Sequence, residues 1–218
     1  MIIDAVYTSI KVVLISLIIT LGISIVAIKI LTRKTTKFKK IIETLIILPM
    51  FIPPSAIGYL ILIICGKNGP IGKILNENFN TSIIFTLSAA VIAAVIVTLP
   101  IMYQSIKVAV LSVDEDVKDA ARAGGASEFK VFTKITLPLS RRGILTGILL
   151  SFSRAFGEFG ATILVAGNIP GKTQTLPMSM YYAIENNNNK EAVTILIIVF
   201  IIAVFLMSLY SYLINKED

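Results

Sequence analysis

Five long apolar stretches limit the folds open to this chain more than any other feature of its sequence. They cover roughly residues 10–31, 42–65, 83–102, 143–165 and 192–214. Each is long enough to cross the hydrocarbon core of a bilayer as a helix, which takes about 20 residues. The sequence therefore predicts an all-α fold, a polytopic integral membrane helical bundle of about five transmembrane helices, with a polar loop at about residues 112–138.

The composition supports a single transmembrane domain over residues 1–218. Hydrophobic residues make up 56% of the chain, charged residues make up 15%, and the mean hydropathy is +0.86, which is unlike a soluble globular protein. The formal net charge of +7 could indicate a nucleic-acid partner, but the basic residues fall between the apolar stretches. We therefore expect contact with membrane lipid and none with nucleic acid.

Cysteine and histidine usage excludes several kinds of site. Cys65 is the single cysteine and the chain has no histidine, so neither an intrachain disulfide nor a cysteine metal cluster can form. The run Gly171-Lys172-Thr173 looks like the end of a phosphate-binding loop, but that loop needs a glycine where Ala166 stands. We therefore expect no metal site, no nucleotide site and no catalytic residue.

The basic residues predict how the chain crosses the membrane. Cytoplasmic links carry an excess of Lys and Arg, and two of the links here do so. The outer links contain only Lys67 and Lys73, and Lys172 and Lys190. The first span has no basic residue before Lys11 and is expected to be retained, with the N-terminus outside and the C-terminus, with Lys216, inside. The basic links contain Arg33, Lys34, Lys37, Lys39 and Lys40, and Lys107, Lys118, Arg122, Lys130, Lys134, Arg141 and Arg142.

The polar loop at about 112–138 has the pattern of two short helices joined by a turn. Ser112 and Glu115 have the spacing of a capping box, and acidic residues fill the turn that follows. Gly125 is suited to the left-handed conformation that ends a helix, and Ser127 to capping a second one. Phe129, Phe132 and Ile135 fall along one side of the second arm.

One face of the first loop helix is built of small apolar residues, which let another surface approach closely. Val117, Ala120, Ala121 and Gly124 recur there at helical spacing. Amphipathicity alone fits equally well a connector that lies on the membrane surface. The spaced glycine and the terminal Ile-x-Leu-Pro favour a docking surface for a partner. Its expected residues are Asp119, Ala120, Ala121, Arg122, Gly125, Ala126 and Ser127.

The second and fourth stretches are not expected to form simple uninterrupted helices that face lipid. Pro49, Pro53 and Pro54 each remove a backbone donor, which predicts a break in the second span. That break fits a packing kink and a lining of the transport pathway equally well. In the fourth span Arg154 and Glu158 lie one turn apart, where charges face a bundle interior or a water-filled cavity.

Two interpretations of the fourth span remain open. Arg154 could offer its guanidinium to an oxyanion. Hydroxyls along a pathway could also tolerate the anion without a fixed cation, and those expected are Ser151, Ser153 and Thr162. Alternatively, Arg154 and Glu158 neutralise each other as an internal support. Their i,i+4 spacing favours the support, because Glu158 would cancel much of the attraction of Arg154 for an anion.

The loop pattern closely resembles the cytoplasmic signature of binding-protein-dependent ABC importer permeases. It reads D-A-A-x-x-x-G, nine residues, I-x-L-P, and opens with Asp119 where that family usually has Glu. The run from Ser151 to Tyr181 looks like molybdate importer permeases, which are closely related to sulfate and tungstate permeases. The resemblance is strong over the C-terminal half, whereas the first half matches mainly through its proline-containing span and its topology.

This resemblance implies the partners and the activity. The partners are a second copy of the chain, two cytoplasmic ATP-binding subunits and an extracytoplasmic oxyanion-binding protein, at the cell membrane of a prokaryote. ATP and Mg would be bound by the ATP-binding subunit, so this chain is a translocating subunit and not an enzyme. The expected activity is import of molybdate, with tungstate a close second, by alternating access.

Other activities are kept as alternatives. A sulfate or thiosulfate ABC permease is the nearest of them. An ATP-independent carrier would leave the D-A-A-x-x-x-G loop without a role. An intramembrane enzyme that used Arg154 and Glu158 would lack histidine and a second carboxylate at that depth.

Overall fold

The computed structural model describes residues 2–32 and 36–215, with side chains up to residue 212, and every regular element in these ranges is helical. Arg33, Lys34 and Lys216, which enter the orientation argument, lie outside the described residues. Three straight helices are long and apolar enough to cross a membrane, and two bent helix pairs raise the total to as many as five spans. The predicted all-α bundle is confirmed. The straight helices are α1 (Ile2–Leu31), α5 (Leu87–Leu111) and α12 (Asn189–Asn215).

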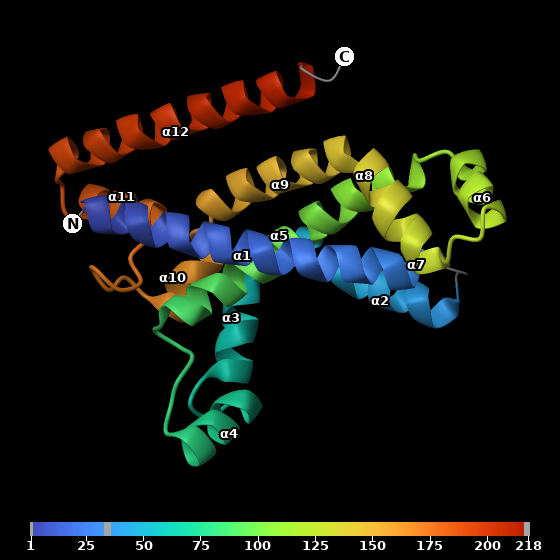
Figure 1. Ribbon diagram of the computed structural model, residues 1–218. Coiled ribbons are helices and arrows are strands. Elements are labelled where there is room, and N and C mark those ends of the chain that lie inside the picture. Colours follow the sequence, from blue (N-terminus) through green and yellow to red (C-terminus); the bar gives the residue numbers. More distant parts are fainter. Residues whose placement is uncertain (1, 33–35, 216–218) are drawn as a thin grey trace.

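Helix α5 is the centre of the bundle. It packs against α1 along one side and against α9 (Arg141–Phe156) along another, and all three helices run along the length of the bundle (Figure 1). Its first half is rich in fully buried alanines, such as Ala89 and Ala93, which let neighbouring helices approach closely. Its second half buries Tyr103 and Ile106 in the same interface as Ile28 of α1.

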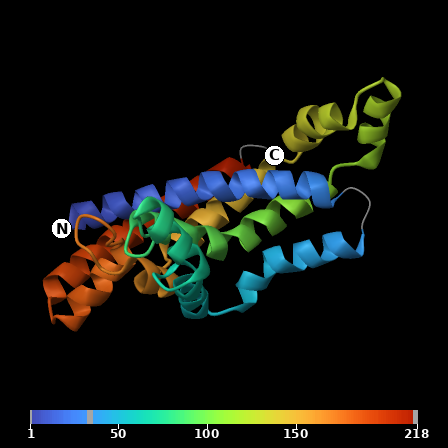
Figure 2. The same ribbon diagram turned by 90° about the horizontal axis from the view of Figure 1, so that it is seen from below.

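The second predicted span is broken, as the prolines indicated. Helix α2 (Lys37–Ile47) continues into a short 3-10 turn (Leu48–Phe51), and α3 (Pro54–Cys65) then leaves at 117°. Pro54 stands in the first turn of α3, where its missing N–H leaves no intrahelical bond unmade. Helix α2 runs beside the main bundle without a buried residue (Figure 2).

Helix α3 projects sideways from the bundle and carries α4 (Pro70–Phe79) at its tip (Figure 1). Helix α4 was not predicted from the sequence and lies in an expected outer link. The base of α3 is held by α10 (Gly160–Ala166) through a very close contact. A Cβ atom added at Gly58 would lie 2.8 Å from the Cα and carbonyl oxygen of Ala161. Only glycine therefore fits at this crossing.

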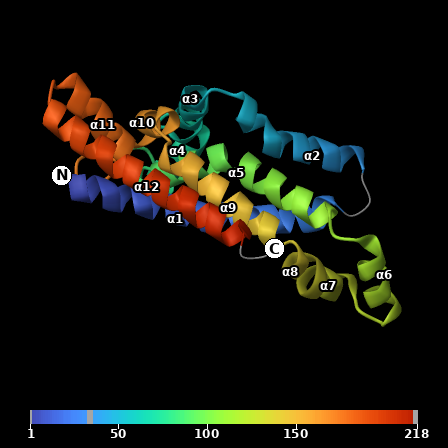
Figure 3. The same ribbon diagram turned by 90° about the horizontal axis from the view of Figure 1, so that it is seen from above.

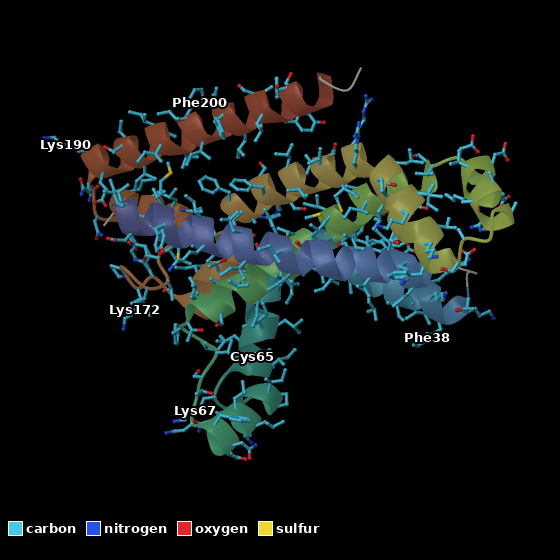
Figure 4. All side chains as sticks on the ribbon, viewed as in Figure 1. Phe38, Cys65, Lys67, Lys172, Lys190 and Phe200 are labelled. Atoms are coloured by element: carbon cyan, nitrogen blue, oxygen red, sulfur yellow. The ribbon has the colours of Figure 1, made fainter. Side chains whose placement is uncertain are left out.

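The fourth predicted span also consists of two helices, because α9 and α10 meet at 59°. After α10 the chain forms a loop and then α11 (Leu176–Glu185), whose first N–H, that of Leu176, donates a 2.8 Å hydrogen bond to Ser9 of α1. Helix α12 packs loosely, with only 11% of its apolar window buried. Its Phe200 is 68% exposed and points away from the bundle, as expected for a face covered by lipid (Figure 4).

We predict that Gly58→Ala destabilises the protein by about 1–3 kcal/mol, because the added methyl group must push α3 away from the α10 backbone. Gly22→Ala is the matched control, since a Cβ at Gly22 meets no atom within 4 Å. That change should be neutral or stabilising by up to about 1 kcal/mol. Thermal unfolding of the detergent-solubilised variants measures both, and equal midpoints would contradict the close crossing.

Candidate functional site

The polar loop lies at the end of the molecule farthest from the N-terminus, beyond the ends of α1 and α5 (Figure 3). Its first helix, α6 (Glu115–Ala123), begins at Asp114, whose carboxylate accepts a 3.0 Å hydrogen bond from the Asp116 N–H. The capping role predicted for Ser112 is therefore wrong. Ser112 keeps a helical backbone at the end of α5, whereas a capping residue needs an extended one, and its hydroxyl donates to the Ala109 carbonyl.

The turn after α6 has the predicted geometry. Gly125 has a φ of +83°, and its N–H donates to the Arg122 carbonyl, while the Ala126 N–H donates to the Ala121 carbonyl. These bonds satisfy the carbonyls that a helix end leaves free. Ser127 caps the second arm by accepting a bond from the Lys130 N–H. The arm comprises α7 (Glu128–Val131), a π turn (Phe132–Thr136) and α8 (Leu137–Leu139).

An ion-pair network on one side of α6 joins it to the second arm. The Arg122 guanidinium bonds to Glu115 at 2.7 Å, to Glu128 at 2.8 Å and to Asp119, and Lys118 bonds to Glu115 at 3.0 Å. Hydrogen bonds from Arg122 and Lys118 lower the pKa of Glu115, and bonds to the three carboxylates raise the pKa of Arg122 above its usual range. The network therefore links α6 to α7 through Arg122 and Glu128.

The opposite side of α6 carries only small or apolar groups. Val117 is 45% exposed, and Ala120, Gly124 and Gly125 are exposed as well. Ala121 is half-buried. The seven residues predicted for docking thus divide into two groups. Ala120 and Gly125 provide the open surface, and Ala121 lies half-buried beside them. Asp119, Arg122, Ala126 and Ser127 hold the shape of the loop through the contacts above.

The loop is also connected to the membrane helices by a contact that the sequence did not suggest. The ammonium group of Lys29, near the end of α1, lies 4.0 Å from the centre of the Phe129 ring. Both residues line a cavity of about 540 Å³ between the ends of α1 and α5, α6 and the second arm. A displacement of the second arm therefore acts on α1 as well as on α9, which follows α8 in the chain.

In the fourth span, Arg154 and Glu158 contact each other, and the contact explains the bend. The Arg154 guanidinium donates a 2.7 Å bond to one oxygen of Glu158, and the other oxygen accepts a 2.8 Å bond from the Ala161 N–H in the first turn of α10. The Glu158 side chain is 2% exposed and that of Arg154 is 32% exposed. Both carboxylate oxygens are used internally, which favours the interpretation as a support.

The three hydroxyls predicted beside this pair are not equivalent. Ser151 and Thr162 are buried, and only Ser153 is exposed. The Ser151 hydroxyl has no hydrogen-bond partner within the described chain. In this conformation, therefore, Ser153 and the free edge of Arg154 are the candidates that an ion outside the protomer can reach.

A second intramembrane ion pair was missed by the sequence analysis. Glu43 of α2 pairs with Lys107 of α5. The third span was expected to end near residue 102, so Lys107 was counted with the loop, but α5 continues to Leu111. The sequence feature that could have indicated this ion pair is Glu43, the only carboxylate in the stretch 42–65. Across the described ranges, no group of three or more His, Cys, Asp or Glu side chains is placed to hold a metal ion.

Known proteins resemble this chain over nearly its whole length. Residues 18–217 match the family described as binding-protein-dependent transport system inner membrane component. The molybdenum transport system permease protein ModB of Haemophilus influenzae is 38% identical over 215 residues, which cover 99% of this chain and 94% of that protein. The sulfate transport system permease protein CysW of Escherichia coli K12 is 30% identical over 217 residues, which cover 98% and 74%.

A solved structure has the same fold. It is that of a bacterial alginate ABC transporter in complex with an alginate pentasaccharide-bound periplasmic protein. The TM-score is 0.78 at 15% sequence identity, with 99% of this chain and 78% of that chain covered. At this identity the likeness concerns the arrangement of the helices alone.

We predict that Glu158→Gln lowers the stability of the protein by about 3 kcal/mol, because it leaves the Arg154 charge without its partner inside the membrane. Arg154→Gln should likewise impair folding or assembly more than it changes anion preference. Glu185→Gln, an exposed change at the end of α11, is the control. A Glu158→Gln protein as stable as this control in thermal unfolding would contradict the support role.

Proposed function

This chain belongs to the family of binding-protein-dependent transport system inner membrane components, and from that premise we propose that it is the permease of an ATP-driven molybdate importer. It is a multi-pass inner membrane protein of a binding-protein-dependent system. Molybdate is favoured as cargo over sulfate, since the identity to ModB is 38% and that to CysW is 30%, each over almost the whole chain. Tungstate is a dianion of nearly the same shape and should be carried almost equally.

The observation that carries the transport role is the form of the polar loop. Helix α6 presents small side chains, such as Ala120, on a body that the Arg122 network holds rigid. That surface suits close docking of another protein, and we assign it to the cytoplasmic ATP-binding subunit. Two such subunits, a second copy of this chain and an extracytoplasmic oxyanion-binding protein complete the proposed transporter. ATP and Mg belong to the partner, so this chain translocates and does not itself hydrolyse ATP.

The proposed orientation places the N-terminus outside and the C-terminus in the cytoplasm. Lys11 and Lys29 lie about 27 Å apart along α1, at 1.5 Å of rise per residue. This distance approaches the roughly 30 Å thickness of the hydrocarbon core. Their ammonium groups can therefore reach the two membrane surfaces, with Lys29 and the loop on the cytoplasmic side. Lys172 and Lys190 lie at the opposite end of the molecule from Phe38, which supports the same assignment (Figure 4).

Transport then follows from movement of the docked loop. ATP binding draws the two ATP-binding subunits together and shifts α6. The Arg122 network transmits the shift to the second arm, and the Lys29–Phe129 contact carries it to α1. The spans open outward to the loaded binding protein, and hydrolysis resets them inward. Selectivity resides mainly in the binding protein, so the permease needs only to tolerate the charge of the dianion.

A sulfate or thiosulfate permease is the second candidate, and the 30% identity to CysW favours it over the remaining alternatives. An intramembrane enzyme is disfavoured because both oxygens of Glu158 are already engaged by Arg154 and Ala161. If the protein were an ATP-independent carrier, the exposed face of α6 would have no partner to bind.

Uptake by the complete complex in reconstituted vesicles tests the cargo. We predict ATP-dependent uptake of molybdate, with tungstate nearly equal, that requires the binding protein. The molybdate-loaded binding protein should also stimulate ATP hydrolysis. Sulfate or phosphate moving as well as molybdate, without any stimulation by the molybdate-loaded protein, would contradict the assignment.

Two loop variants test the coupling role. Ala121→Trp overpacks the docking surface, and Gly125→Val places a β-branched residue at a φ of +83°. Each should insert normally in the membrane yet fail to couple ATP hydrolysis to uptake, because overpacking costs about 1–3 kcal/mol and weakens assembly by one or two decades. Asp119→Glu is the control and should be nearly neutral, since the longer carboxylate can still reach Arg122. Normal uptake by both variants would reduce the loop to a linker.

A further inference from the structure

The Glu43–Lys107 pair lies on the cytoplasmic side of the bundle, away from the docking surface. The two side chains are 24% and 26% exposed. Lys107 precedes the end of α5 by about 6 Å, and Glu43 follows the start of α2 by about 9 Å, at 1.5 Å per residue. Both charges therefore lie just inside the cytoplasmic ends of their helices, at the edge of the hydrocarbon core.

Charges at this depth face a bundle interior or a water-filled cavity and not lipid. The exposed quarter of each side chain therefore faces water or the second copy of the chain. A half-buried ion pair is also weak support for a fold, because desolvation offsets much of its attraction and apolar residues often replace it without loss. The stability of the fold alone therefore does not explain why Glu43 and Lys107 occupy these positions.

Tyr103 places a second donor next to this pair. It precedes Lys107 by one helical turn on α5, so the two side chains share a face. Tyr103 is fully buried, and its hydroxyl interacts with the Glu43 carboxylate. An ammonium and a hydroxyl thus converge on one point, and the oxyanion that occupies it here is the carboxylate of Glu43.

Helix α2, which carries Glu43, packs on the bundle only through partly buried residues. None of its residues is fully buried, and it ends at the proline-containing break before α3. Ile42, Ile46 and Ile47 pack against the core, whereas Phe38 and Leu45 on the opposite side are 70% and 60% exposed. An element with few fully buried contacts opens at lower free-energy cost than a core helix. The ion pair with Lys107 adds a polar contact between α2 and α5.

We propose that Lys107 and Tyr103 form a transient binding site for the tetrahedral dianion on its way to the cytoplasm, and that Glu43 closes this site when it is empty. The site rests on the proposed import of an oxyanion. A dianion that reaches Lys107 displaces the singly charged carboxylate of Glu43, and α2 separates from α5. In the inward state that hydrolysis restores, the cargo thus releases this last contact, and Glu43 returns to Lys107 once the cargo has left.

Tyr103→Phe is the most informative variant, with Ser24→Ala as its matched control. Each change removes one fully buried hydroxyl, that of Tyr103 beside Glu43 and that of Ser24 without a partner in the described chain. In vesicles containing the complete complex, we measure molybdate moved per ATP hydrolysed. Tyr103→Phe should lower this ratio about tenfold, the scale of one hydrogen bond to a charged group. ATP hydrolysis stimulated by the loaded binding protein should persist, and Ser24→Ala should leave the ratio unchanged.

Charge variants separate a gate from a structural ion pair. Lys107→Gln should lower the same ratio at least as much as Tyr103→Phe. The double exchange of Glu43→Lys with Lys107→Glu should restore assembly but not the ratio, because the acceptor and the donor have changed places beside Tyr103. An unchanged ratio in Tyr103→Phe, or a full recovery in the double exchange, would overturn the proposal.

Failure of the cargo assignment would be seen separately in the unmodified complex. If that complex moves sulfate and not molybdate, the proposed cargo is wrong, and the same variants are compared with sulfate. The donors of Lys107 and Tyr103 recognise any tetrahedral dianion, so the tenfold loss in Tyr103→Phe is expected there too. A ratio unaffected by Tyr103→Phe with the transported ion would still reject the gate.

Discussion

A charge inside a bilayer has to be matched inside the protein, and this constraint determines where the bundle bends and where it is loosely joined. Glu158 meets this constraint by accepting two hydrogen bonds, one from the Arg154 guanidinium and one from the Ala161 N–H at the start of α10. The break between α9 and α10 is therefore stabilised by the same carboxylate that neutralises the arginine. Glu43 and Lys107 meet the constraint by pairing between two separate helices, α2 and α5.

In the polar loop, charged side chains are likewise paired within the protein, and these ion pairs link the two arms of the loop. Arg122 contacts carboxylates from both arms of the loop, so that α6 and α7 are held as one body. The paired charged side chains of α6 face the second arm of the loop, and the opposite side of α6 carries small residues such as Ala120. A partner can approach such a surface closely and displace the loop as a unit. Lys29 and the chain itself then connect that displacement to the membrane helices.

Much of this architecture follows from local patterns in the sequence. The apolar stretches predicted the spans, the prolines predicted the break before α3, and Gly125 and Ser127 predicted the turn of the loop. The predictions were wrong where a local sequence pattern fits two structures or stops before the helix does. Ser112 has the spacing of a cap but lies in the last turn of α5, and Lys107 interrupts an apolar pattern without interrupting the helix.

Contacts between residues far apart in the sequence could not be predicted from these local patterns. Lys107 pairs with a carboxylate 64 residues away, and no periodicity in either helix specifies that partner. The direction in which α3 leaves the bundle depends on the crossing of Gly58 and Ala161, which is set by packing and not by propensity. For the same reason Arg154 and Glu158 could be recognised as a pair from their spacing, whereas the bond from Ala161 to Glu158 required the bend to be known.

Photocrosslinking in the assembled transporter tests most directly whether α6 docks on the ATP-binding subunit. A photoreactive residue at Ala120 lies on the exposed face of the loop, and one at Ile74 lies on α4, which we place outside the membrane. We expect Ala120 to crosslink to the ATP-binding subunit and Ile74 not to do so. Crosslinking of Ile74 to that subunit, or none from Ala120 in a complex that transports molybdate, would contradict both the docking role of α6 and the orientation of the chain.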